Sequence, residues 1–440
     1  GTRPVSVVSR VTVRSKPDGP DTVNAAGAPG GRPVTVMARR PVAMAYGTLT
    51  EADAGPDGPV TPCVEVVTAY PLPWCVQAER VNLSDPHVHP PREAVQAAAE
   101  LLAGAKRPGV LVGSRVQEMG AVDSLVALAE QLGAQVISES GTTHGRLAFP
   151  CNHPLYGQGL PLWSPEVRNR LAEFDVLLLV GLDVLRQYIH HEPGRAIPEH
   201  IRLVQLDFDP WQLGKNYAVE CGLIGHARTG LEDLLAGVRQ RQTPEESQQA
   251  AARVAAYAKA AEAARKSFER EIETQAAARP LAPAVLMRAV ARALPHDAAV
   301  IEEAVTTTNT TLERLGALGN TSGYFGHRGW SLGWGLGCTL GVKLAWPGRP
   351  VLGILGEGAV MYGIQGLWTA ARYNIGAKFV ICNNGQYGIL KACSHVYGLP
   401  EARRGRYESL DLNHPEIDIV AIARALGVET HRITEPEELT

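Results

Sequence analysis

The feature that most constrains the fold is an alternation of short, mainly apolar runs with helical patterns over residues 90–240. The run Val176–Val180 is wholly apolar, and Ile201–Leu206 is apolar apart from Arg202 and Gln205. Between such runs, Glu93–Ala103 and Ala121–Leu132 have apolar residues at helical spacing. Continuous apolar strands that alternate with helices are typical of parallel sheets covered on both faces, with right-handed crossovers. We therefore predict a doubly wound α/β domain, with further strands at 109–112, 135–138 and 222–225 and further helices at 165–173 and 230–239.

The same alternation returns in the last third of the chain, after a long segment rich in Ala, Glu, Gln, Lys and Arg at 245–278. That segment contains neither Pro nor Gly, which favours one or two solvated helices that connect domains. We expect a central α/β domain at 91–240, a helical linker at 241–280 and a second α/β domain at 281–440. The second domain is predicted to have strands at 299–302, 350–355 and 378–382 and helices at 283–294 and 364–373.

The first ninety residues have a different composition. Residues 1–60 hold 8 Gly and 8 Pro but a single Leu and a single aromatic residue. Such a segment can bury little apolar surface to offset the entropy cost of ordering. We expect residues 1–90 to be an irregular Gly/Pro-rich segment with no recognisable domain. The alternative is the damaged remnant of a real domain.

Composition excludes several classes of protein. The net charge of −3 gives no support for a nucleic-acid partner. The longest apolar run, Val176–Leu182, is far shorter than the roughly 20 residues of a membrane-spanning helix. The seven cysteines are scattered with no CxxC pair, which argues against a disulfide scaffold or a zinc site. With no export signal at the start of the chain, we expect a cytoplasmic protein without a membrane partner.

Polar side chains follow two successive strands of the second domain. Glu357 comes at the end of one strand, and Asn383 and Asn384 follow the next, so 27 residues separate Glu357 from Asn384. Ligands of open parallel sheets bind beyond the carboxyl ends of the strands. Carboxylate and amide oxygens suit Mg²⁺, and Gly358 and Gly385 let backbone N–H groups approach phosphates. The sequence thus predicts a magnesium–diphosphate site, the alternative being that both motifs form only turns.

The motif Gly356-Glu357-Gly358, followed after twenty-four residues by Asn383-Asn384, resembles the thiamine-diphosphate fingerprint. The surrounding sequence at 367–375 and 383–388 resembles the benzoylformate decarboxylase branch of the 2-oxo-acid decarboxylase and acetolactate synthase superfamily. The segment Leu206-Asp207-x-Asp209-Pro210 resembles that superfamily's central domain. The resemblance covers residues 91–440. It implies thiamine diphosphate and Mg²⁺ as cofactors and a 2-oxo acid as substrate.

The resemblance also implies individual roles. Glu357 and Asn384 would hold Mg²⁺ through side-chain oxygens and Gln386 through its carbonyl. Leu332 matches the apolar wedge that bends the cofactor, with simple core packing as the alternative, and the Trp330 carbonyl would accept a hydrogen bond from the cofactor's amino group. Thr306 is expected near the end of a strand over 302–308. The residues expected to line the cofactor are Thr306, Gly356, Gly358, Ala359, Asn383, Tyr387 and Gly388.

The chain departs from the family pattern at the magnesium site. The family's acidic ligand is Asp, whereas this chain has Glu357. The extra methylene moves the carboxylate by about 1.5 Å, and Mg²⁺ tolerates little deviation from octahedral geometry. We expect Mg²⁺ still to bind, but more weakly.

A second departure concerns the family's pyrimidine-binding domain, which carries a catalytic Glu that reaches the cofactor across a subunit interface. We find no such Glu: the candidates before residue 90 are Glu51, Glu65 and Glu79, and each lies in sequence without a helical pattern. The family's active-site His is also missing near residues 281–283. We expect a homo-oligomer, dimer or tetramer, or a separate chain that supplies the acid.

The chain stops just after the helix signal at Pro436, where the family continues. We expect a fragment, truncated at its C-terminus, with impaired activity on its own. The function predicted is non-oxidative decarboxylation of a 2-oxo acid. The alternatives are an acetolactate-synthase-like carboligase and a non-catalytic cofactor-binding fragment.

Other polar residues are expected to have structural or solvated roles. Asp85, His87 and His89 occupy every second position, a spacing that could place all three on one face as metal ligands. The neighbouring prolines at 86 and 90 favour an exposed loop instead. Asp207 and Asp209 could bind a nucleotide, although a loop role is favoured. The basic residues past the cofactor strand could contact substrate, although a solvated face is favoured; these are Lys391, His395, Arg403, Arg404 and Arg406.

Overall fold

The computed structural model describes residues 22–23, 36–37, 87–139, 145–161, 164–185, 195–308, 310–326 and 331–439. The chain divides into two units, 1–86 and 87–440. In the first unit, β1 (Thr22–Val23) pairs antiparallel with β2 (Val36–Met37). The rest of that unit lies outside the described residues, so the expectation of an irregular segment at 1–90 stays a prediction.

The central domain contains a sheet of six described strands, all parallel, in the order β5-β4-β3-β6-β7-β8. Every residue of β3 and β6 is buried, as their apolar runs predicted. β5 was not predicted, because its Tyr-Gly-Gln-Gly sequence lacks an apolar run. The strands are β3 (Pro108–Val112), β4 (Gln135–Ser138), β5 (Tyr156–Gly159), β6 (Val176–Val180), β7 (Arg202–Asp207) and β8 (Cys221–Ile224).

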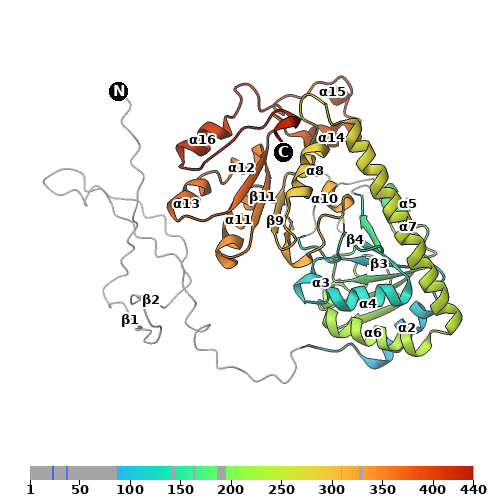
Figure 1. Ribbon diagram of the computed structural model, residues 1–440. Helices are drawn as coiled ribbons and strands as arrows, with labels where there is room; N and C mark the ends of the chain where they lie inside the picture. Colours follow the sequence, from blue (N-terminus) through green and yellow to red (C-terminus); the bar gives the residue numbers. More distant parts are fainter. Residues whose placement is uncertain are drawn as a thin grey trace, which may run out of the picture. The chain divides into compact units, whose positions relative to one another are not determined.

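Helices cover both faces of this sheet (Figure 1). Helices α2, α4 and α6 lie side by side on one face, and α5 packs on the other through Val167 and Leu171. Helix α4 ends at Gly133, whose left-handed φ of 58° favours glycine at this position. These helices are α2 (Arg92–Ala103), α3 (Arg115–Glu118), α4 (Val122–Leu132), α5 (Ser164–Leu171) and α6 (Ala227–Arg241).

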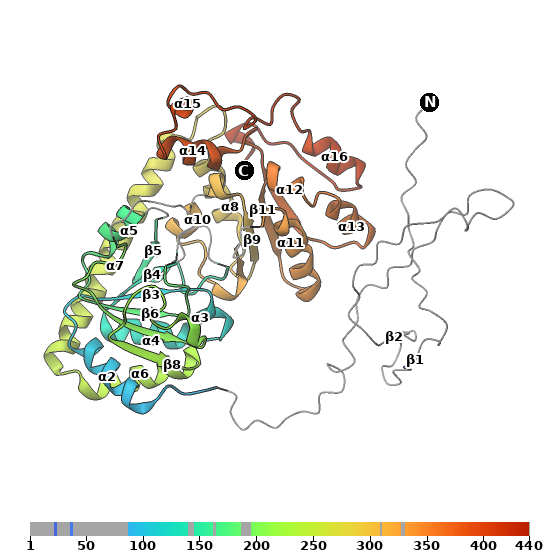
Figure 2. The same cartoon turned by 180° about the vertical axis from the view of Figure 1, so that it is seen from behind.

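One 31-residue helix, α7 (Pro244–Thr274), follows the central domain and runs along the second unit in both views (Figures 1 and 2). It begins with a capping box between Thr243 and Glu246. The expected helix is confirmed, but its solvation was overstated, because Phe268 and Ile272 are buried. Arg253 also donates to the Leu132 carbonyl at 2.7 Å, so this charge holds the end of α4 rather than facing water.

The second domain contains four described strands, all parallel, in the order β10-β9-β11-β12. The strands are β9 (Ala299–Glu303), β10 (Tyr324–Phe325), β11 (Val351–Gly356) and β12 (Lys378–Cys382). The helices are α8 (Pro283–Ala293), α9 (Val305–Thr308), α10 (Thr311–Arg314), α11 (Trp334–Ala345), α12 (Glu357–Val360), α13 (Gly366–Arg372), α14 (Gly388–Val396), α15 (Pro400–Arg403) and α16 (Ile419–Ala425). Short 3₁₀ turns lie at Pro210–Gln212, Thr321–Gly323 and Pro436–Glu438. The predicted α/β class with two parallel sheets is confirmed.

The expected strand over 302–308 is wrong beyond Glu303. The chain turns into the short helix α9, in which the Thr308 hydroxyl donates to the Ala304 carbonyl and to the buried Glu302 carboxylate. The run of threonines favoured a strand by local propensity. These side-chain hydrogen bonds satisfy the Thr308 hydroxyl in a helical turn instead.

The two sheets of the second unit share one apolar core. Val110 and Val112 of the central sheet belong to the same buried cluster as Val300 and Ile354 of the second sheet. Arg146 also bridges the domains, donating to the Tyr324 and Ser322 carbonyls. Among the helices that the structure describes, none is long and apolar enough to cross a membrane.

Candidate functional site

The ends of β11 and β12 place the predicted site residues at one edge of the second sheet. Gly356 and Cys382, the last residues of these strands, are paired in register. Glu357 follows as the first residue of α12, and Asn383 and Asn384 follow β12. The common edge expected from the 27-residue spacing is therefore present.

The three predicted magnesium ligands converge at this edge. The Gln386 backbone N–H donates to Glu357 Oε1 at 3.2 Å and to Asn384 Oδ1 at 3.1 Å. Two side-chain oxygens thus meet at a single donor, and the Glu357 side chain is nearly buried. The carbonyl of Gln386 accepts no hydrogen bond from the described backbone. One carboxylate, one amide oxygen and one such carbonyl form an oxygen donor set that fits Mg²⁺.

Asn383 has a different role from Asn384. Its Oδ1 accepts from the Gly385 N–H at 3.0 Å, and Gly385 has a φ of 65° that favours glycine. Asn383 therefore shapes the turn after β12, as the alternative interpretation of a paired Asn proposed. Asn384 Oδ1 likewise accepts from the N–H two residues later, that of Gln386, but this N–H also donates to Glu357.

The residues expected around the diphosphate lie close together, and no side chain of Gly358 or Gly388 fills the space between them. A Cβ added at Gly388 would lie 3.2 Å from the Thr306 methyl and 3.4 Å from the Asn384 amide. A Cβ added at Gly358 would lie 3.0 Å from the Tyr387 ring. The two glycines thus leave a cradle bounded by Thr306, Asn384 and Tyr387, which fits a phosphate approached by backbone N–H groups.

The remaining two expected cofactor contacts flank this cradle. Gly356 caps the N-terminus of α12, and Ala359 lies inside that short helix. The Ala359 side chain is buried, so only its backbone can face a ligand.

The loop that carries Gln386 is held by a pair of residues that the sequence did not reveal. Gln386 forms an antiparallel bridge with Asp411, and Lys391 Nζ donates to Gln386 Oε1 at 2.7 Å and to Asp411 Oδ1 at 2.5 Å. Lys391 was considered only as a substrate contact or a solvated residue. Its pairing with Asp411 depends on how the chain folds back between these two residues, and no short sequence motif signals such a pairing.

The turn that carries Leu332 is anchored by Glu303. This carboxylate accepts from the Gly333 N–H at 2.7 Å and from the Gly335 N–H at 2.9 Å, at the start of α11. Burial raises the pKa of Glu303, although these backbone donors oppose the rise. The Leu332 side chain is 51% exposed, so the alternative of core packing is wrong. Trp330 lies outside the described residues, and its expected role stays a prediction.

Asp207 and Asp209 have the structural roles that we favoured. Arg115 donates to Asp207 at 2.8 Å and to Asp183 at 2.7 Å, where β6 and β7 end. Asp209 caps the turn that follows, accepting from the Trp211 N–H. Asp85 lies outside the described residues, among which no group of three acidic, His or Cys side chains could hold a metal.

Comparison with known families identifies both domains. Residues 95–234 match the family described as thiamine pyrophosphate enzyme, central domain, and residues 306–440 match the C-terminal TPP binding domain. The chain belongs to the thiamine pyrophosphate enzymes. This confirms the predicted resemblance and the expectation of thiamine diphosphate as the cofactor of the second domain.

Individual relatives within the thiamine pyrophosphate enzymes include decarboxylases and synthases. The chain is 31% identical over 340 residues to a benzoylformate decarboxylase of Pseudomonas aeruginosa, covering 77% of this chain and 58% of the relative. It is 27% identical over 361 residues to an acetolactate synthase large subunit of Parasynechococcus marenigrum, covering 80% and 54%. The chain therefore spans little more than half the length of these relatives.

Solved structures of thiamine-diphosphate-dependent enzymes share the fold. A 4-hydroxybenzoylformate decarboxylase of Rhodococcus jostii superposes with a TM-score of 0.65 at 27% identity, covering 82% of this chain and 62% of that chain. A thiamin diphosphate-dependent enzyme of Mycobacterium smegmatis superposes with a TM-score of 0.63 at 25% identity, covering 81% and 62%.

Proposed function

We propose that the protein is a thiamine-diphosphate- and Mg²⁺-dependent lyase that removes CO₂ from a 2-oxo acid without oxidation. The observation that carries the proposal is the convergence of Glu357, Asn384 and Gln386 inside a C-terminal TPP binding domain. Its relatives include a benzoylformate decarboxylase and, at 33% identity, a probable 2-ketoarginine decarboxylase of Pseudomonas aeruginosa. Both names describe loss of CO₂ from a 2-oxo acid.

The chain's own residues would bind and orient the cofactor. Glu357, Asn384 and the Gln386 carbonyl would hold Mg²⁺, while Gly358 and Gly388 would admit the phosphates. When bound, thiamine diphosphate supplies an electron sink for the loss of CO₂. The exposed Leu332, fixed by Glu303 through the backbone of the next turn, would support the cofactor from the side.

Activity would further require a carboxylic acid from a pyrimidine-binding domain. We propose that the chain assembles as a homo-oligomer, as family members do, and that a separate chain supplies this acid. The free cysteines among the described residues fit a reducing compartment, and we place the protein in the cytoplasm.

Titration of the purified chain with thiamine diphosphate tests cofactor binding. We expect calorimetry to detect saturable binding in the presence of Mg²⁺ and much weaker binding in EDTA. Thiamine without phosphates is the matched control and should not bind measurably, because the cradle recognises the phosphates. Equal binding of thiamine and thiamine diphosphate would contradict the proposal.

Product analysis separates the decarboxylase from its alternative, a carboligase like acetolactate synthase, which the synthase relative supports. With the acid-supplying chain present, the 2-oxo acid that serves as substrate should yield CO₂ and the corresponding aldehyde. Benzoylformate and pyruvate are the first two candidates to test. A 2-hydroxyketone as the main product would favour the carboligase. Cofactor binding without exchange of its C2 proton, even with an added partner chain, would favour a non-catalytic cofactor-binding protein.

A further inference from the structure

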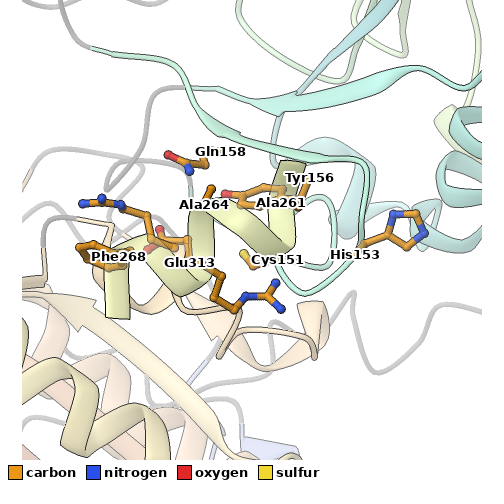
Figure 3. Close-up of a pocket in the computed structure, with 10 residues that line it drawn as sticks. Cys151, His153, Tyr156, Gln158, Ala261, Ala264, Phe268 and Glu313 are labelled. Carbon is orange, nitrogen blue, oxygen red and sulfur yellow. The ribbon is translucent and has the colours of Figure 1, made fainter. Parts of the chain in front are cut away.

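A cavity of about 80 Å³ lies away from the cofactor site, where the segment 151–158 meets helices α7 and α10 (Figure 3). Its wall includes Cys151 and Tyr156 from the central domain and Ala261 and Ala264 from α7. A single water needs only about 10–15 Å³ of such space. The cavity can therefore admit a small organic molecule.

A guanidinium group with one unsatisfied N–H lines this cavity. Arg265 reaches it from α7, and its Nε is buried without a hydrogen-bond partner in the described structure. The guanidinium lies against the backbone at Gly316, where an added Cβ would come 2.8 Å from its Nη2. A buried charged donor without an acceptor is costly, so a bound acceptor at this position would stabilise the protein.

A second guanidinium stands beside it. The Arg314 guanidinium lies 3.3 Å above the Phe268 ring, and its Nη2 is 3.8 Å from Glu271 Oε2, a long ion-pair distance. Stacking on a ring fixes the plane of a guanidinium and leaves its N–H groups pointing outward along the edges. Both Arg314 and Phe268 line the cavity. Two cations thus face a space too small for a large ligand.

The inner wall carries acidic groups that are uncharged near neutral pH. Burial raises the pKa of Cys151 and Tyr156 well above their usual values and that of Glu313 to about 8. A protonated carboxyl donates a hydrogen bond and does not repel an anion. Figure 3 shows Glu313 and Tyr156 on the same cavity as Cys151.

We propose that this cavity binds a small carboxylate, paired with Arg265 and Arg314 and hydrogen-bonded by Glu313. The site is independent of the proposed cofactor function, since no residue of the cofactor cradle lines it. Carboxylate oxygens match guanidinium edges in geometry and charge. A protonated carboxyl next to a carboxylate adds a short, charge-assisted hydrogen bond.

Calorimetric titration and thermal unfolding of the full chain at pH 7 test the proposal. Sodium acetate should bind saturably and raise the unfolding temperature, compared with sodium chloride at equal ionic strength. Inorganic phosphate is the second probe and should bind more weakly. Tighter binding of phosphate would overturn the assignment of a carboxylate, and the absence of saturable acetate binding would overturn the site.

Substitutions identify the residues responsible. Arg265→Gln should weaken acetate binding at least tenfold, whereas Arg270→Gln, an exposed change on the same helix, should leave it unchanged. If Arg265→Gln fails to fold, Arg265→Lys keeps the charge and should bind with intermediate affinity. Acetate binding that is unaffected by the Arg265 variants would show that the anion binds elsewhere.

The pH dependence supplies a further readout. Acetate affinity of the native chain should fall about tenfold between pH 7 and pH 9 as Glu313 becomes charged, and Glu313→Gln should remove this fall. The other titratable groups that face Glu313 are Cys151, Tyr156, Glu302 and Tyr324, and burial raises the pKa of each. A fall that persists in Glu313→Gln would contradict the role of Glu313.

Discussion

At the scale of single residues, the site depends on which oxygen atoms share a donor. Glu357 lies on α12 and Asn384 follows β12, yet both accept from the Gln386 N–H. A longer acid than the family's Asp can occupy this position because its carboxylate reaches across to the Gln386 backbone. This hydrogen bond from the Gln386 N–H to Glu357 Oε1 would be lost if that oxygen turned to bind a metal.

Replacing the acid tests this arrangement. Glu357→Gln keeps the hydrogen bond from Gln386 but removes the negative charge, so Mg²⁺-dependent binding of thiamine diphosphate should weaken at least tenfold, about 1.4 kcal/mol. Calorimetry at fixed cofactor with increasing Mg²⁺ measures the change. Glu357→Asp is the matched control, and it should bind Mg²⁺ at least as tightly as the native chain. Unchanged Mg²⁺ dependence in Glu357→Gln would exclude this residue as a ligand.

Glu313 makes a second prediction about a single residue, in the absence of any ligand. Burial raises its pKa to about 8 from the ordinary value of 4.5. The folded chain therefore holds a proton that the unfolded chain has lost between these pH values, so the free energy of unfolding should decrease as pH rises from about 5 to about 8. Urea unfolding across this range measures the slope. Glu313→Gln should flatten it, and an equally steep slope in the variant would contradict the assignment.

At the scale of elements, the site is assembled from strand ends and held by contacts between distant segments. Glu303 at the end of β9 caps the start of α11 and so fixes the turn that bears Leu332. Lys391 of α14 holds the Gln386 loop to the segment around Asp411. The Gln386 loop and the Leu332 turn are thus held by tertiary hydrogen bonds, while the strand ends supply Glu357, Asn383 and Asn384.

Two glycines of the α11 region should respond differently to alanine. Gly333 has a φ of 94°, and an added Cβ would lie 2.3 Å from Tyr362 Cβ, whereas nothing lies within 4 Å of a Cβ at Gly337. Gly333→Ala should cost about 1–3 kcal/mol of stability and weaken cofactor binding by displacing the Leu332 turn. Gly337→Ala, inside the helix, should be neutral or stabilising by about 0.5–1 kcal/mol. Equal unfolding temperatures for the two variants would contradict this interpretation of the turn.

Buried elements could be predicted from the sequence, whereas partners that lie far apart could not. The strands Gln135–Ser138, Val176–Val180 and Lys378–Cys382 were predicted with the limits observed, because short runs with an apolar centre mark strands of a covered sheet. The threonines at 306–308 were misassigned, since hydrogen bonds to Glu302 and Ala304 outweigh strand propensity. Glu303 was missed as an anchor because its partners lie some thirty residues away.

At the scale of the whole molecule, the two domains of the second unit form a continuous body with one shared core. The core that contains Val110 of the central sheet also contains Tyr324 and Ile354 of the second domain. Arg146 and Cys151 of the central domain donate to backbone carbonyls of the second domain, including that of Leu318. The cofactor domain is therefore supported along one side by the central domain.

The last prediction concerns the activity of the chain alone. We expect it to bind thiamine diphosphate with Mg²⁺ but not to exchange the cofactor's C2 proton, because the acid that activates the pyrimidine ring is expected from another polypeptide. Proton exchange followed by NMR in D₂O measures this directly, and CO₂ release from benzoylformate is the matching assay. Glu51→Gln, Glu65→Gln and Glu79→Gln locate the acid if exchange does occur. Exchange that one of these variants abolishes would overturn the prediction and place the catalytic acid in the first ninety residues of this chain.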